Sequence, residues 1–395
     1  MAYWAEIPFE SIYLEPSKNG VNRPRSTRGS GYKMINMGEL FKYARINNPE
    51  MELVPLNEDE KEKYGVQEGD LLFARQSLVK EGAGKCSIVL SVPEPTCFEG
   101  HLIRVRLDKT KAVPLFYYYY FSSSEGNGKV QSLVMQVAAA GIRGSELAKL
   151  PISYPPLPVQ RKIADVLSAY DDLIEVNARR IRVLEAMAQS VYREWFGKVD
   201  ANAKSLPRGW EMKKLGDIAK EVRRSVQPDQ IDPETPYFGL EHLPRKSITL
   251  SDWGNASEVQ STKLAFKEGE ILFGKIRPYF HKVGIAPLDG VSSTDAIIII
   301  PNEPEYFGLV LSCVSSEDFV SHATQSSQGT KMPRADWKVL VKYPILVPPK
   351  DILNKHNDFM RDIVGMIKNL IFANRNLRRT RELLLPRLVS GEVGV

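Results

Sequence analysis

The chain carries the same sequence pattern twice, and this internal repeat constrains its fold more than any other feature. Residues 68–75 read EGDLLFAR, and residues 268–275 read EGEILFGK in the second half of a chain of 395 residues. Matching pairs follow in the same order: Ser123-Ser124-Glu125 with Ser315-Ser316-Glu317, Gly141-Ile142-Arg143 with Gly329-Thr330-Lys331, and Pro151-Ile152 with Pro344-Ile345. Units this long differ from the roughly 20–50-residue units of a solenoid. The repeat therefore predicts a duplicated globular module, suited to a target that itself has two halves.

Composition excludes several classes of protein. The chain is 43% hydrophobic and 26% charged, which is typical of a globular protein. We expect no membrane span, because no run approaches the roughly 20 apolar residues that a span needs, and no signal peptide in the opening MAYWAEIPFE. Cys86, Cys97 and Cys313 lack metal or redox spacing, which suggests a reducing cytoplasm. The net charge of +5 permits a polyanionic partner.

Proline-rich segments divide the chain into four predicted parts. Tyr154-Pro-Pro-Leu-Pro and Pro348-Pro349 end regular structure, because proline removes a donor and restricts the residue before it. The parts are a module at 1–155, a long helix at 156–200, a second module at 206–348 and a second long helix at 349–390. Each module mixes short β-type runs with helix-length apolar stretches. The predicted fold class is therefore α/β (mixed α+β), with two tandem modules related by a pseudo-twofold.

Both long segments repeat apolar residues every three or four positions, as in a coiled coil. The seam residues are Ile163, Leu167, Ile174, Asn177, Ile181 and Leu184 in the first helix, and Ile363, Ile367, Leu370, Asn374 and Leu377 in the second. We expect an antiparallel pair, with the two asparagines fixing the register; the alternative is that each helix packs on its own module. A helix of about 33 residues would make a rod of roughly 50 Å, which would span about 15 base pairs of DNA.

Basic and amide-bearing loops recur at matching places in the two modules. The candidate DNA-binding residues are Arg75, Gln76, Lys80, Arg143 and Ser145 in the first module, and Lys275, Arg277, Tyr279, Lys282, Gln328, Thr330, Lys331 and Arg334 in the second. Arginine and lysine bind guanine edges or phosphates, and glutamine binds adenine. A solvated basic loop is the plain alternative, but repetition at matching positions favours DNA readout.

The sequence shows no motif for chemistry of its own. Its five histidines lack metal-ligand spacing, and GxGxxG, GxxxxGK[ST] and the Asn- or Asp-Pro-Pro-aromatic motif of amino-methyltransferases are all missing. Asp171-Asp172 on an arginine-rich helix predicts surface ion pairs rather than acid–base catalysis. The aromatic run at 116–121 predicts a packed helix rather than a base-stacking platform, because the second module is aliphatic there. A DNA-targeting chain of this kind must borrow its catalyst.

The segment from Tyr154 to Phe196 closely resembles the central conserved region of type I restriction–modification specificity (S) subunits. It has their proline-rich entry, Pro158-x-Gln160, Lys162-Ile163-Ala164 and a late aromatic cluster. The opening Leu206-Pro-x-Gly-Trp210 of the second module and the stretch at 329–334 are also similar to the family. The resemblance covers essentially the whole chain. The second helix departs from the pattern, because Leu353 stands where the first has Gln160, and His356 and Arg381 lie on its seam.

The resemblance implies a non-catalytic specificity subunit. Each module would be a target-recognition domain for one half of a bipartite, asymmetric DNA site, and the helical pair would set the spacer. The helices would dock two modification (M) subunits that bind S-adenosylmethionine and methylate adenine, and restriction (R) subunits would add ATP- and Mg-dependent cleavage. No cofactor or metal is expected in this chain. Two alternatives stay open: a coiled-coil scaffold without DNA readout, and a fused methyltransferase or nuclease with an unrecognised catalytic centre.

Overall fold

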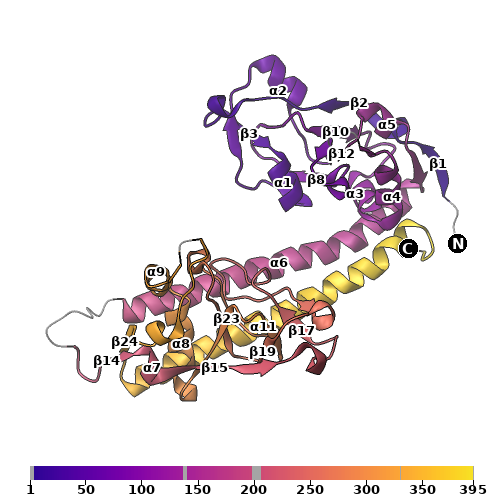
Figure 1. The fold of residues 1–395 in the computed structure, drawn as a ribbon. Coiled ribbons are helices and arrows are strands. Elements are labelled where there is room, and N and C mark those ends of the chain that lie inside the picture. Colours follow the sequence, from indigo (N-terminus) through magenta and orange to yellow (C-terminus); the bar gives the residue numbers. More distant parts are fainter. Residues whose placement is uncertain (1–3, 137–139, 198–205, 330, 395) are drawn as a thin grey trace. The chain divides into compact units, whose positions relative to one another are not determined.

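The computed structural model describes residues 4–136, 140–197, 206–329 and 331–394. It divides into two compact units, Met1–Leu173 with Leu377–Val395, and Ile174–Asn376. Both divisions between the units fall within the two long helices, α6 (Leu157–Phe196) and α11 (Lys350–Val389), which are visible in Figure 1. The mixed α+β class with two modules and two long helices is confirmed. Among the described residues, no helix is both long and apolar enough to cross a membrane.

The first unit is built on a five-stranded sheet. Its order is β2 (Tyr13–Asn19), β10 (Leu102–Leu107), β6 (Leu71–Ala74), β8 (Cys86–Ser91) and β4 (Arg45–Asn47). Smaller sheets are β1 (Ala5–Pro8) with β13 (Pro151–Tyr154); β5 (Glu52–Val54), β3 (Tyr32–Ile35) and β9 (Thr96–Phe98); and β11 (Met135–Gln136), β12 (Ala140–Gly141) and β7 (Gln76–Ser77). The short helices are α1 (Met37–Lys42), α2 (Glu58–Tyr64), α3 (Pro114–Ser122), α4 (Ser124–Ser132) and α5 (Gly144–Ala148). Helix α3 buries the aromatic run at 116–121, which confirms its prediction as a packed helix.

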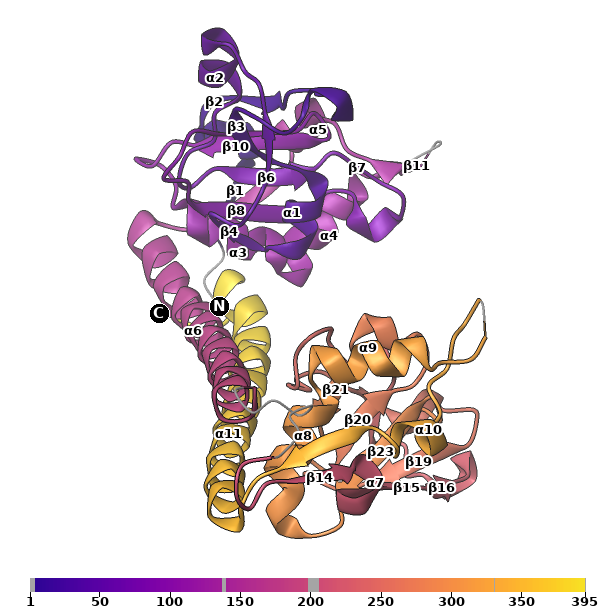
Figure 2. The same cartoon turned by 90° about the vertical axis from the view of Figure 1, so that its left-hand side faces the viewer.

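The second unit has two larger sheets. One has the order β15 (Ala219–Val222), β23 (Ala296–Pro301), β20 (Ile271–Gly274) and β21 (Val283–Ile285). The other has the order β16 (Arg224–Val226), β19 (Lys263–Phe266), β22 (Gly290–Ser292), β17 (Pro236–Phe238) and β18 (Gly254–Asn255). A two-stranded sheet joins β14 (Glu211–Lys214) to β24 (Pro344–Val347), and the short helices are α7 (Leu215–Ile218), α8 (Phe307–Val314), α9 (Glu317–Gln325) and α10 (Trp337–Leu340). Figure 2 shows α8, α9 and α10 around the strands of this unit.

The repeat in the sequence is a repeat in topology. The order β2-β10-β6-β8 in one module matches β15-β23-β20-β21 in the other, and the parallel pair β3 and β9 matches the parallel pair β17 and β22. The turns before β6 and β20 place Gly69 and Gly269 at φ of 92° and 81°, a backbone region that favours glycine. The next residue closes each turn: Asp70 accepts from the amide of Gln67 at 2.8 Å, and Glu270 from that of Lys267 at 2.9 Å. The repeated EGD and EGE motifs are therefore structural.

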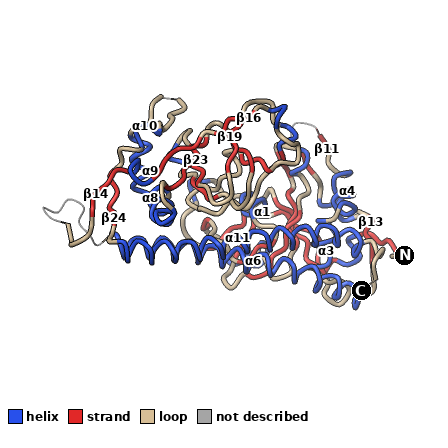
Figure 3. The backbone as a smooth tube through the Cα atoms, turned by 90° about the horizontal axis from the view of Figure 1, so that it is seen from below, coloured by secondary structure: helices blue, strands red, loops and turns tan. Residues whose placement is uncertain are grey.

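The two long helices pack together in antiparallel orientation (Figure 3). In the second unit Asn177 Nδ2 donates to Asn374 Oδ1 at 2.9 Å, and Asn374 Nδ2 donates to the carbonyl of Ile174 at 3.3 Å. The predicted seam residues are buried or half-buried: Ile163, Leu167, Ile174, Asn177, Ile181, Leu184, Ile363, Ile367, Leu370, Asn374 and Leu377. In this pairing the buried asparagines meet each other, so each amide has a polar partner within the apolar seam.

The two unusual residues on the second helix have different surroundings. His356 is fully buried beside the rings of Tyr192, Trp195 and Phe196. Arg381 pairs, in the first unit, with the buried carboxylate of Asp171, which also accepts from the Tyr119 hydroxyl at 2.7 Å. The expectation of surface pairing is therefore wrong for Asp171. Its charge is buried and balanced by a cation and a hydroxyl, as a buried carboxylate requires.

Candidate nucleic-acid interface

The structure brings the two predicted loops of the second module together. The amide of Ala335 donates to the carbonyl of Lys275 at 2.9 Å, and the amide of Arg277 donates to the carbonyl of Pro333 at 2.7 Å. Ile276 and Arg334 also form an isolated β-bridge. Residues 275–282 therefore lie beside Gln328 and residues 331–334 at the end of β20, although the two segments are far apart in the chain.

The candidate side chains on this second-module surface differ in their solvent exposure and in their hydrogen bonds. Gln328, Lys331 and Arg334 are exposed, Tyr279 is 50% exposed, and Thr330 lies outside the described residues. Arg277, half-buried at φ 50°, donates from Nη2 to the carbonyl of Lys331 at 3.5 Å. The Lys282 amine donates to the carbonyl of Leu240, and burial lowers its pKa. Lys282 therefore anchors a neighbouring loop. Among the exposed residues, Arg334 Nε lies 3.7 Å from the carboxylate of Asp295.

Backbone hydrogen bonds hold the candidate loops of the first module together in the same way. The amide of Ile142 donates to the carbonyl of Arg75 at 2.9 Å, as Ala335 does to Lys275 in the other module. The amide of Arg75 donates to the carbonyl of His101 at 2.8 Å, and the amide of Lys275 donates to the carbonyl of Asp295 at 2.9 Å. In both modules, the residue that directly follows the buried strand is held between two other segments by backbone hydrogen bonds. The candidate surface is therefore built by the shared fold rather than by chance similarity of charge.

The candidate side chains of the first module surround this bracket of backbone hydrogen bonds. Gln76 lies on β7, which pairs with β12 at Gly141, and Gln76, Arg143 and Ser145 are exposed. Arg75 is half-buried, and its Nη1 donates to the carbonyl of Gly100 at 3.4 Å. The side chain of Lys80 lies outside the described residues. The first module thus presents an amide, a hydroxyl and a guanidinium on one surface.

One basic residue of the second-module surface does not follow from the repeat. The guanidinium of Arg245 lies over the ring of Phe280, 4.1 Å from its centroid, next to Tyr279 in sequence. The signal that could have revealed it is the pair Arg245-Lys246 after Pro244.

Among the described residues, no group of three or more His, Cys, Asp or Glu side chains is arranged to hold a metal ion.

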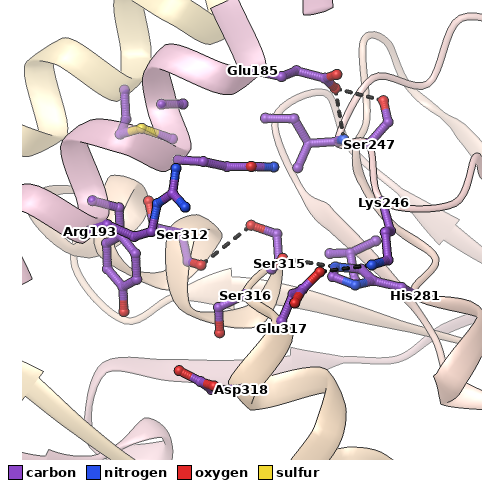
Figure 4. A pocket seen from close by; sticks show the side chains of 16 residues that line it. Glu185, Arg193, Lys246, Ser247, His281, Ser312, Ser315, Ser316, Glu317 and Asp318 are labelled. Carbon is purple, nitrogen blue, oxygen red and sulfur yellow. Dashed lines mark hydrogen bonds and ion pairs between the residues drawn. The ribbon is translucent and has the colours of Figure 1, made fainter. Parts of the chain in front are cut away.

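A cavity of about 630 Å³ lies between α6 and the module within the second unit (Figure 4). On one side, Oε1 of Glu185 accepts hydrogen bonds from the Ser247 hydroxyl at 2.6 Å, the Thr249 hydroxyl at 2.8 Å and the amides of Ile248 and Thr249 at 2.9 and 3.1 Å. Lys246, which precedes Ser247 in the chain, pairs with Glu317 at 2.8 Å, and His281 Nε2 lies 2.9 Å from the carbonyl of Ser315. Glu185 therefore fastens the second module to the long helix.

The fold thus combines two modules that carry matching bracketed loops with a pair of antiparallel helices. Residues 17–186 match the family described as "Type I restriction modification DNA specificity domain". The chain is similar to type I restriction–modification specificity subunits, and the resemblance predicted from the sequence is confirmed.

Individual relatives agree with this assignment. The MjaIX specificity subunit of Methanocaldococcus jannaschii is 29% identical over 276 residues, covering 64% of this chain and 63% of that protein. The EcoKI specificity subunit of Escherichia coli K12 is 27% identical over 198 residues, covering 48% and 42%. The matches thus span less than two thirds of these relatives. The crystal structure of the S subunit from M. genitalium has the same fold, with a TM-score of 0.57, 14% identity and coverage of 98% and 96%.

Proposed function

We propose that this chain is the DNA sequence-specificity subunit of a type I restriction–modification complex. Each module reads one half of a bipartite, asymmetric DNA site. The observation that carries the proposal is the bracket repeated in both modules, which places exposed polar and cationic side chains at the end of the central strand. Base edges are read by such groups, and phosphates by the cations among them. In this proposal the chain acts in the cytoplasm on double-stranded DNA.

The helical pair is proposed to set the spacer between the half-sites. Support comes from the paired asparagines, because shifting one helix along the other would separate them and leave polar groups unpaired in an apolar seam. A slip of one heptad would move the helices by about 10 Å, or about three base pairs of DNA. The register of the seam would therefore determine which spacer length the complex accepts.

The helices are also proposed to dock two modification subunits. Support comes from a groove of about 590 Å³ on the helical pair in the second unit, lined almost entirely by apolar surface. It is formed by Val176, Arg179, Arg180, Val183, Leu184, Met366, Asn369 and Leu370. Met366 and Val183 are 53% and 58% exposed, and a protein partner would bury them. Catalysis is assigned to the partners: S-adenosylmethionine in the modification subunits, and ATP with Mg in the restriction subunits.

The proposal is tested by selecting bound duplexes from a random DNA pool with the full chain assembled on its modification subunits. We expect one motif with two defined halves and a fixed spacer. Arg143→Ala is expected to degrade one half only, and Arg334→Ala the other half only. Lys220→Ala, an exposed lysine on β15, is the matched control and should leave both halves intact. Selection of no bipartite motif by the unaltered chain would overturn the proposal.

A further inference from the structure

Large apolar side chains are exposed on the loops that carry the candidate DNA-binding residues. Leu78, directly after β7, is fully exposed at 101% and its neighbour Val79 at 60%. Met135 on β11, in the same small sheet, is 42% exposed. The second module repeats this feature on its own bracketed loops, with Tyr279 at 50% and Met332 at 48%. These apolar side chains lie among the candidate DNA-binding residues, where contact with an apolar group of the ligand would bury them favourably.

The backbone holds Leu78 in its exposed position. The Ser77 hydroxyl accepts from the amide of Val79 at 3.2 Å, and the amide of Gly82 donates to the carbonyl of Val79 at 3.1 Å. On the other side, β7 pairs with β12 in a short antiparallel sheet, and Leu78 directly follows β7. Leu78 is therefore an exposed side chain on an ordered backbone, and burying it against another molecule would be favourable.

The neighbours of Leu78 indicate what that molecule is. Gln76 and Arg143, on the same small sheet and bracket, are exposed and suited to base edges and phosphates. The major groove of DNA admits a β-ribbon, and the thymine 5-methyl is an apolar group displayed there. We propose that Leu78, with Val79 beside it, packs against a thymine methyl group in the half-site read by the first module. This inference rests on the proposed function and adds an apolar contact to it.

The test uses the full chain with its modification subunits and a duplex carrying the motif selected above. Each thymine of the first module's half-site is replaced in turn by deoxyuridine, which removes only the methyl group. We expect one replacement to weaken binding about tenfold, the scale set by burying part of a leucine side chain. Leu78→Ala should weaken binding to the original duplex about equally and should be insensitive to that replacement. The salt dependence of binding should stay unchanged, because no phosphate contact is lost.

Leu14→Ala is the control, since Leu14 is 63% exposed on β2 of the same module; it should bind as the unaltered chain does. Three results would overturn the inference: no deoxyuridine effect, equal weakening by Leu78→Ala on all sequences, or loss of modification subunits from the Leu78→Ala complex with DNA affinity kept. The last would make Leu78 a protein contact. A bipartite motif still selected by the unaltered chain would leave the proposed function standing in each case.

Discussion

Replacing Glu185 with alanine should loosen the second module from its helix. One carboxylate oxygen accepts four hydrogen bonds from residues 247–249, at 2.6–3.1 Å. The two hydroxyls can turn to water, and the Thr249 amide keeps a second acceptor in Ser247 Oγ at 3.2 Å. The Ile248 amide loses its acceptor. Since hydrogen bonds to a charged group contribute about 1.5–3 kcal/mol, we expect a loss of roughly 3 kcal/mol in the unfolding free energy of this unit.

Tryptophan fluorescence is a suitable assay for this loss. Four of the five tryptophans, Trp195, Trp210, Trp253 and Trp337, lie in the second unit, so the thermal transition that fluorescence follows reports mainly on that unit. For a unit of this size each kcal/mol moves the midpoint by about 2–4 °C, so the expected decrease is about 6–12 °C.

Two matched variants make the prediction about Glu185 specific. Glu185→Gln keeps an acceptor oxygen and should lose only about 1 kcal/mol, the difference between a charged and a neutral hydrogen bond. Gln189→Ala, an exposed position one turn further along the same helix, should melt like the unaltered chain. The reasoning fails if Glu185→Ala melts like the unaltered chain, or if Glu185→Gln is as unstable as Glu185→Ala.

Three further predictions concern the reading loop, the seam and the buried histidine. Lys331→Ala should weaken binding of one half-site only, by about 1–3 kcal/mol, if it contacts a base edge; equal weakening on all duplexes with a shallower salt dependence would indicate a phosphate contact. Asn177→Leu alone should destabilise the second unit by about 1–3 kcal/mol, because Asn374 Oδ1 loses its donor, whereas Asn177→Leu with Asn374→Leu should restore stability and let methylation assays accept spacers about three base pairs longer or shorter. Burial lowers the pKa of His356 from 6.5 to about 4. Between pH 6.5 and pH 4 the unfolded chain therefore binds a proton at this histidine that the folded chain does not bind. The free energy of unfolding should be unaffected by His356 above pH 6.5 and should fall by about 1.4 kcal/mol per pH unit as the pH drops towards 4. Urea unfolding at several pH values should show that slope, and His356→Phe should flatten it.

The duplication, the mixed modules and the long helices could be predicted because their signals are local. Turn glycines, flanking prolines and a heptad spacing act within a few residues, and each occurs twice. The sequence showed that the candidate loops occur at matching positions in the two modules, but it did not show that the loops within one module contact each other. The bracket itself depends on backbone hydrogen bonds between Arg75 and Ile142, and between Lys275 and Ala335, which no spacing rule specifies.

Side-chain roles that depend on distant partners were missed or misassigned. Asp171 has the appearance of a surface acid on a basic helix, yet it is buried because Tyr119 and Arg381 reach it from elsewhere in the chain. Lys282 has the appearance of a free cation in a basic loop, yet its amine is bound to the Leu240 carbonyl. In the sequence Glu185 is an ordinary acidic residue in the middle of a helix. Its role in fastening the second module to that helix is visible only in the four hydrogen bonds that it accepts.

The central claim is that this chain selects a bipartite DNA site for modification. The most direct measurement maps adenine methylation along the genomic DNA of its host, with the gene present, deleted, and restored carrying Arg334→Ala. The account predicts that deletion removes methylation at one motif with two halves and a fixed spacer, and that the Arg334→Ala gene alters one half only. Unchanged methylation on deletion, or loss at a continuous motif without a spacer, would contradict the account.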